Sequence, residues 1–176
     1  MEKQDTSQDA GKQNVPQIDP RRLQSYLQEV RDSQSLPLAV LGGFAAAAVA
    51  AGIWAYVTVL TNYQIGWMAI GVGFLVGYAV RLLGKGIDQP FGIAGGAIAL
   101  LGCAMGNFLT VLLMVSREKE IPLLELFGRL TPELAMDIMV STFQPMDVLF
   151  YGLAIYVGYK YAFRPIPDED LAKLVQ

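Results

Sequence analysis

Long uncharged apolar stretches alternate with short polar blocks along this chain. The clearest case runs from Gly66 to Met114, where two apolar runs flank the polar turn 84–90. An apolar segment of about 18 or more residues is a candidate membrane span, since roughly 20 helical residues cross the hydrocarbon core. By this measure the sequence predicts four spans, at about residues 36–60, 65–83, 91–116 and 146–163. We therefore expect one membrane domain over residues 35–164.

The two segments that precede the first span differ in pattern. Residues 1–18 are polar and show no apolar period, which predicts a disordered tail. Residues 19–34 open with Asp19-Pro20, a pair typical of a helix start. One face of this helix then carries Leu23, Tyr26, Leu27 and Val30. The pattern predicts an amphipathic helix that docks onto a partner, the membrane surface or the protein's own spans.

Residues 117–145 are the one long polar segment between predicted spans. Thr131-Pro132-Glu133 is typical of a helix N-terminus, and apolar residues recur on one side before and after it. Two short amphipathic helices that lie in the interface fit this pattern, and so does a docking platform or a lid over a pore. Residues 165–176 complete the chain as a tail. The predicted fold class is all-α: an integral membrane four-helix bundle with interfacial amphipathic helices.

The distribution of basic residues predicts the orientation of the bundle. Four spans place both termini and the turn 84–90 on one side, with ten of the 13 Lys and Arg residues. The remaining three are Arg117, Lys119 and Arg129. Because Lys and Arg concentrate on the cytoplasmic side, both termini should be cytoplasmic and residues 117–145 should face outward.

Composition argues against an enzyme. Charged residues make up 16% of the chain, against about 25% in soluble domains, which indicates a membrane protein. The chain has no histidine, so it lacks the commonest general acid/base and a frequent zinc ligand. Its one cysteine, Cys103, lies in an apolar run with no candidate base beside it. We expect no catalytic residues, no cofactor, no metal and no nucleic-acid partner.

Small residues line the predicted spans at helical spacing. Close backbone approach holds helices together in lipid, where the hydrophobic force between them is weak. The predicted packing positions are Gly73, Gly77, Gly92, Gly96, Gly102 and Gly106. Either a partner subunit or another helix of the same bundle could pack against these glycines.

Few polar residues fall within or beside the spans. Asn107 and Thr110 follow the glycines of the third span and are candidates for a polar contact, as is Arg81 at the end of the second. A membrane-embedded Asn usually hydrogen-bonds to another helix. The Gly84-Lys85-Gly86 turn lacks the spacing of a phosphate-binding loop and predicts a tight turn. Trp54, Tyr56 and Tyr63 predict an aromatic belt at the outer interface.

The hairpin around this turn resembles one found in uncharacterised bacterial multi-pass membrane proteins. The resemblance rests on residues 76–88, on Phe91-Gly-Ile and on the run Leu100-Leu-Gly-Cys-Ala-Met-Gly-Asn107. It covers about 35 to 40 residues and implies a bacterial inner-membrane location. That family has no established activity, so the resemblance implies no functional residue.

Two functions fit these apolar spans, small residues and few polar residues. The small-residue grooves and the amphipathic segments favour an accessory or scaffold subunit of a larger inner-membrane complex, with the lipid bilayer and other membrane subunits as partners. The alternative is a small homo-oligomeric channel or transporter, in which Asn107 and Thr110 would line the path. Coupled transporters usually carry ionisable residues inside their spans, and this chain has almost none there.

Overall fold

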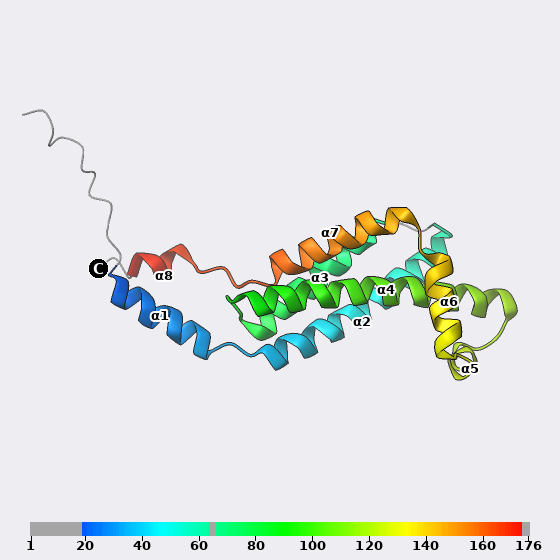
Figure 1. Ribbon diagram of the computed structural model, residues 1–176, viewed down its shortest axis with the longest axis horizontal. Helices are drawn as coiled ribbons and strands as arrows, with labels where there is room; N and C mark the ends of the chain where they lie inside the picture. Colours follow the sequence, from blue (N-terminus) through cyan, green and yellow to red (C-terminus); the bar gives the residue numbers. More distant parts are fainter. Residues whose placement is uncertain (1–18, 64–65, 174–176) are drawn as a thin grey trace, which may run out of the picture. The chain divides into compact units, whose positions relative to one another are not determined.

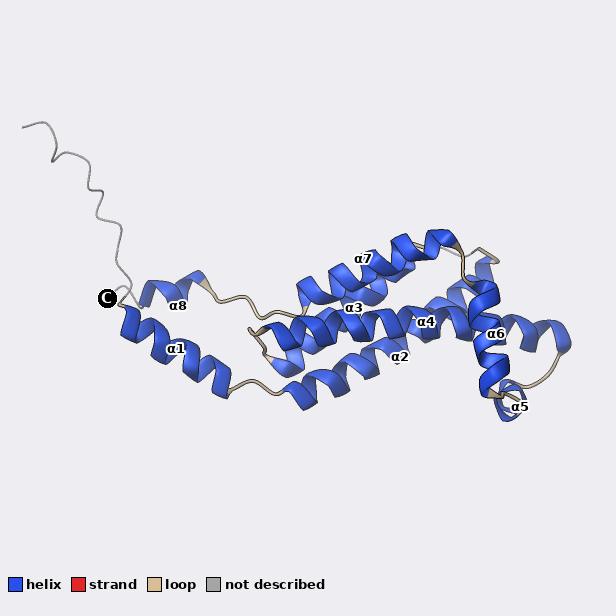
Figure 2. Cartoon of the chain, viewed as in Figure 1, coloured by secondary structure: helices blue, strands red, loops and turns tan. Residues whose placement is uncertain are grey.

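The computed structural model describes residues 19–63 and 66–173, and their regular structure is entirely helical (Figure 2). The helices are α1 (Pro20–Asp32), α2 (Leu36–Thr61), α3 (Met68–Gly84), α4 (Gln89–Lys119), α5 (Leu123–Gly128), α6 (Pro132–Thr142), α7 (Pro145–Tyr161) and α8 (Asp168–Lys173). The predicted disordered tail (1–18) and the predicted start of the second span at residue 65 lie outside the described residues.

The chain divides into two compact units. The larger unit covers residues 33–164, and the smaller one contains α1 and α8. In the smaller unit the Tyr26 hydroxyl donates to Asp170 Oδ2 at 3.1 Å. The sequence predicts residues 19–34 and 165–176 as separate segments, whereas α1 and α8 belong to one unit in the structure. Nothing in the local apolar period of either segment indicated this pairing, because it links residues 144 positions apart.

The long helix α4 is the centre of the larger unit. It contacts α2, α3, α5, α6 and α7, and Figure 1 shows it between α2 and α7 with α6 crossing it. Helix α3 lies against α2, α4 and α7. Among the described helices, α2 and α7 do not contact each other. The pair α3–α4 therefore forms the middle of a four-helix bundle, with α2 and α7 on its two sides.

The apolar helices indicate a membrane protein, with two to three candidate spans by length and composition. Helices α2 (26 residues) and α4 (31 residues) are each long and apolar enough to cross a bilayer. Helices α6 and α7 meet at a bend of 99° and supply a third candidate if the pair is one span. Helix α3 is a shorter apolar helix of 17 residues. The predicted bounds hold closely for α2, while α4 is longer than predicted at both ends.

The turn between α3 and α4 ties together one end of the bundle. Lys85 adopts a left-handed conformation (φ 51°) at the C-cap of α3, which is a common way to end a helix. The Gly84 carbonyl accepts from the Ser35 amide at 3.0 Å, and the Gly86 carbonyl accepts from the Arg164 amide at 2.8 Å. The tight turn thus holds the start of α2 and the chain that leaves α7.

The bundle interior is filled by small and branched side chains. The largest fully buried residues are Trp54, Val76, Val80, Thr58 and Cys103. The burial of Trp54, which is only 2% exposed, contradicts its assignment to an aromatic belt. Its indole packs against Gly106 of α4, where a glycine leaves room for it. Tyr56 and Tyr63 remain exposed.

Backbone contacts at glycine join α7 to the α3–α4 pair. A Cβ on Gly158 would lie 2.7 Å from the Gly95 carbonyl oxygen and 2.8 Å from the Ala99 Cβ. On the other side, a Cβ on Gly73 would lie 2.5 Å from the Ala154 carbonyl oxygen, and one on Gly77 would lie 2.8 Å from that of Gly158. These approaches leave no room for a side chain where Gly158 of α7 meets the α3–α4 pair, and we call this contact the seam.

Replacing Gly158 with Ala should therefore destabilise the bundle. We expect Gly158→Ala to lower the free energy of unfolding by about 1–3 kcal/mol, the usual cost of overpacking. The matched control is Gly152→Ala on the same helix, where no atom lies within 4 Å of an added Cβ. It should leave stability unchanged or raise it by up to about 1 kcal/mol, because Ala favours helix over Gly. SDS denaturation in mixed micelles, followed by circular dichroism, measures both; equal effects would contradict the close seam.

Candidate functional site

The six predicted packing glycines all face helices or side chains of the same chain. Gly73 and Gly77 meet the α7 backbone, and Gly92 and Gly96 meet the α7 side and its C-terminal end. An added Cβ on Gly102 would lie 2.9 Å from Val72 and 3.2 Å from Ala47. Gly106 faces Trp54. The bundle's own helices occupy these grooves, so a partner is not needed to explain them.

Sequence reasoning missed the other half of the seam. Gly95 of α4 packs against Gly158, and Ala154, Gly158 and Ala162 are all buried. Ala154 and Gly158 of α7 and its C-cap residue Ala162 recur every four positions, which is the small-residue spacing that marks a helix contact. This spacing is visible in the sequence, although large aromatic residues lie between the three positions.

The three predicted polar-contact residues do not come together. Asn107 and Thr110 are both buried on α4, and the Thr110 hydroxyl donates to the Gly106 carbonyl at 2.8 Å within its own helix. Arg81 lies in the last turn of α3, with its guanidinium carbon 5.9 Å from the centre of the Tyr78 ring. Asn107 is 18 residues beyond the start of α4, or about 27 Å along the helix. Arg81 therefore belongs to the opposite end of the bundle.

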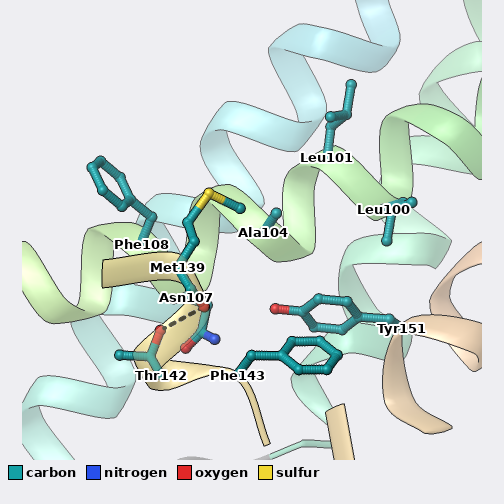
Figure 3. Close-up of a pocket in the computed structure, with 9 residues that line it drawn as sticks. All are labelled: Leu100, Leu101, Ala104, Asn107, Phe108, Met139, Thr142, Phe143 and Tyr151. Carbon is teal, nitrogen blue, oxygen red and sulfur yellow. Dashed lines mark hydrogen bonds between the residues drawn. The ribbon is translucent and has the colours of Figure 1, made fainter. Parts of the chain in front are cut away.

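Asn107 instead faces a pocket of about 360 Å³ between α4, α6 and α7. Figure 3 shows the residues that line it. They are Leu100, Leu101, Ala104, Asn107, Phe108, Met139, Thr142, Phe143 and Tyr151. The volume falls in the range of about 300–1,000 Å³ that is usual for small-molecule sites. Most of the lining is hydrocarbon or aromatic, which suits an apolar ligand.

Three polar side chains gather at one corner of this pocket. The Tyr151 hydroxyl points towards Asn107, and the two side chains interact (Figure 3). The Thr142 hydroxyl donates to the Ile138 carbonyl at 2.7 Å, and the Met139 carbonyl lies 3.4 Å from it. None of the lining residues carries a charge. The corner can hydrogen-bond a neutral polar group, and we refer to Asn107, Thr142 and Tyr151 as the polar corner.

Helix α6 has a second face that points away from α4. Ala135, Ile138 and Thr142 are half-buried and recur at the spacing of one helix side. The opposite side carries two acids and two apolar residues, all exposed: Glu133, Met136, Asp137 and Val140. Met136 is 62% exposed and Val140 is 69% exposed. We refer to these four residues as the outer face of α6.

The acid nearest the pocket has a structural role. Asp147 is buried, and its Oδ2 accepts from the Gln144 amide at 2.9 Å. This contact forms part of the capping box at the start of α7, where a carboxylate also suits the positive end of the helix dipole. Among the described residues, no three His, Cys, Asp or Glu side chains lie close enough to hold a metal ion.

No protein-family model, curated protein or solved structure matches this chain.

Two buried polar atoms on α2 lack a hydrogen-bond partner within the described structure. They are Trp54 Nε1 and Thr58 Oγ1, one helical turn apart on the same side of the helix. Both residues are almost completely buried, at 2% and 1% exposure. A buried polar atom without a partner costs free energy, so these atoms should destabilise the bundle.

Replacing Thr58 with Val should consequently stabilise the protein. The substitution removes an unpaired hydroxyl from the interior, and we expect the free energy of unfolding to rise by about 1 kcal/mol. Thr110→Val is the matched control because it removes a hydroxyl that is paired, and it should lower stability by about 0.6 kcal/mol. SDS denaturation compares the two variants. A loss of stability in Thr58→Val would mean that this hydroxyl has a partner after all.

Proposed function

We propose that the protein is a non-enzymatic accessory or scaffold subunit of a larger bacterial inner-membrane complex. One observation carries the proposal: α5 and α6 contain no buried residue although both are rich in apolar side chains. Leu124 of α5 is 86% exposed, and Met136 and Val140 of α6 are both more than 60% exposed. An apolar surface on a segment outside the bundle is typical of an interaction site.

The composition of the outer face of α6 favours a protein partner over lipid. Glu133 and Asp137 lie on the same helix side as Met136 and Val140. A carboxylate that enters the hydrocarbon layer is costly, so this face does not suit insertion into the bilayer. A partner surface that combines apolar and basic residues would satisfy both kinds of side chain. The partner we infer is therefore a neighbouring subunit with a basic, partly apolar outer segment.

The proposal includes four spans, formed by α2, α3, α4 and α7. Helices α3 and α7 each have 17 residues, or about 25 Å of helix, which is at the short limit for a span. Helix α7 packs against α4 where Gly158 meets Gly95, and α3 packs against α4 where Val72 meets Gly102. A helix that lies alongside a span in this way shares its environment, which supports four crossings.

The proposed orientation places both termini in the cytoplasm and α5 and α6 outside. Its support is the excess of Lys and Arg on the side of the termini and the turn 84–90. The inner-membrane location is supported by the resemblance of the hairpin to bacterial multi-pass proteins. In this arrangement the outer face of α6 is available to a subunit that projects from the same membrane.

The composition of the native assembly tests the proposal. Gentle extraction of the protein, tagged at its natural level of expression, should yield a second protein in a fixed ratio. Asp137→Lys and Val140→Ser should each reduce that ratio about tenfold, as expected when a contact worth about 1.4 kcal/mol is lost. Glu118→Lys is the matched control, an exposed acid on α4 that lies outside the outer face, and it should leave the ratio unchanged.

A wild-type protein that elutes alone or only with copies of itself would contradict the accessory role. A homo-oligomer would favour the channel alternative, which liposome flux in wild type and Asn107→Ala would then examine. If Glu118→Lys lost the second protein as fully as Asp137→Lys does, the negative charge of the whole segment, rather than the outer face of α6, would hold the partner.

A further inference from the structure

The pocket beside Asn107 continues along the bundle as a longer groove. A second pocket of about 340 Å³ lies between α4 and α7, lined by residues that include Ile93, Ala97 and Tyr159. Leu100 lines both pockets, so the two adjoin. We call the combined surface the α4–α7 groove. It opens sideways from the bundle, because Ile93 is 62% exposed and Leu101 is 53% exposed.

The dimensions of the groove match a lipid chain. On α4 it extends from Ile93 to Phe108, which is about 22 Å at 1.5 Å per residue. One leaflet contributes about 15 Å of the roughly 30 Å hydrocarbon core. The groove is therefore long enough to hold an extended acyl chain along its length. The second pocket has almost no polar surface, consistent with the hydrocarbon end of such a chain.

The polar corner lies within about 6 Å of the edge of the hydrocarbon core, where the ester groups of lipids are found. Asn107 is 16 residues beyond Phe91, or about 24 Å along α4. If the hydrocarbon core of the bilayer begins near Phe91, Asn107 lies within the last 6 Å or so of that core. Helix α6 crosses α4 (Figure 1), and its residues Met139 and Thr142 line the same pocket as Asn107. The helix turns 99° away from α7, as an interfacial helix does.

The chemistry of the polar corner selects a neutral acceptor. The Asn107 amide has two N–H donors and the Tyr151 hydroxyl has one, which is more than their contact with each other uses, and no residue that lines the pocket is a cation able to bind a phosphate. Ester carbonyl oxygens are neutral acceptors that adjoin an acyl chain. From the length, the sideways opening and the polar corner together, we propose that the α4–α7 groove binds one glycerophospholipid of the bilayer. An acyl chain occupies the groove, and an ester carbonyl meets the polar corner.

This inference depends on the membrane placement of α4 and α7 proposed above, and it is independent of the partner at the outer face of α6. Lipid retention can be measured on the purified chain whether or not a second subunit exists. A failed partner search and a failed lipid experiment are therefore separate results.

Native mass spectrometry after reconstitution and detergent extraction tests the site. The probe is a vesicle of phosphatidylethanolamine and phosphatidylglycerol, and wild type should retain one phospholipid per chain. Ala104→Phe and Ala97→Phe place a ring in the two halves of the groove, and each should reduce occupancy about tenfold. Ala48→Phe on the exposed side of α2 is the matched control and should retain the lipid. Ala97 is itself exposed, so that variant keeps the interior intact even if Ala104→Phe folds poorly.

Diether phosphatidylglycerol with the same chains separates the polar corner from the apolar groove. It lacks the ester carbonyls, so wild type should bind it about tenfold more weakly than the diester lipid, and Asn107→Leu should bind both alike. Absence of a retained lipid in wild type, or full retention in Ala97→Phe, would overturn the proposed site. Equal binding of both lipids by wild type would overturn the role of the polar corner.

Discussion

The fold depends on the close approach of three helix backbones at Gly158. In lipid, helices gain little from hiding apolar surface from one another, so contact between backbones and small side chains must hold them. Gly158 of α7 meets Gly95 of α4 and Gly77 of α3 at the same level. This contact fixes α7 against the α3–α4 pair, and it thereby places Tyr151 beside Asn107. The pocket is a consequence of the seam.

Much of the fold could be predicted from the sequence because the governing signals are local. Apolar run lengths gave the bounds of α2, and Thr131-Pro132 marked the start of α6, where the Thr131 hydroxyl accepts from the Leu134 amide. Glycine spacing identified Gly73 and Gly77 as contact residues but could not say what they contact. Which side of each helix meets which neighbour depends on tertiary packing, and the same spacing would serve a partner or the bundle itself.

The features that bear on function were the hardest to predict. Trp54 reads as an interface residue, because aromatic residues near a span end are usually found there; only the space beside Gly106 allows its burial. The polar corner combines residues from α4, α6 and α7, and no local pattern links them. The sequence makes Asn107 a candidate for a polar contact, but its neighbour Tyr151 depends on the packing of α7. The bend between α6 and α7 completes the pocket and turns the outer face of α6 away from the bundle.

Labelling of single cysteines at the two ends of α4 tests the membrane placement most directly. In a Cys103→Ala background, Gln89→Cys and Glu118→Cys place one exposed thiol at each end of the helix. A membrane-impermeant maleimide applied to intact spheroplasts should label Glu118→Cys and should reach Gln89→Cys only after permeabilisation. Labelling of both sites in intact spheroplasts, or of neither, would mean that α4 does not cross the membrane, and both the outward position of α6 and the lipid groove would then be wrong.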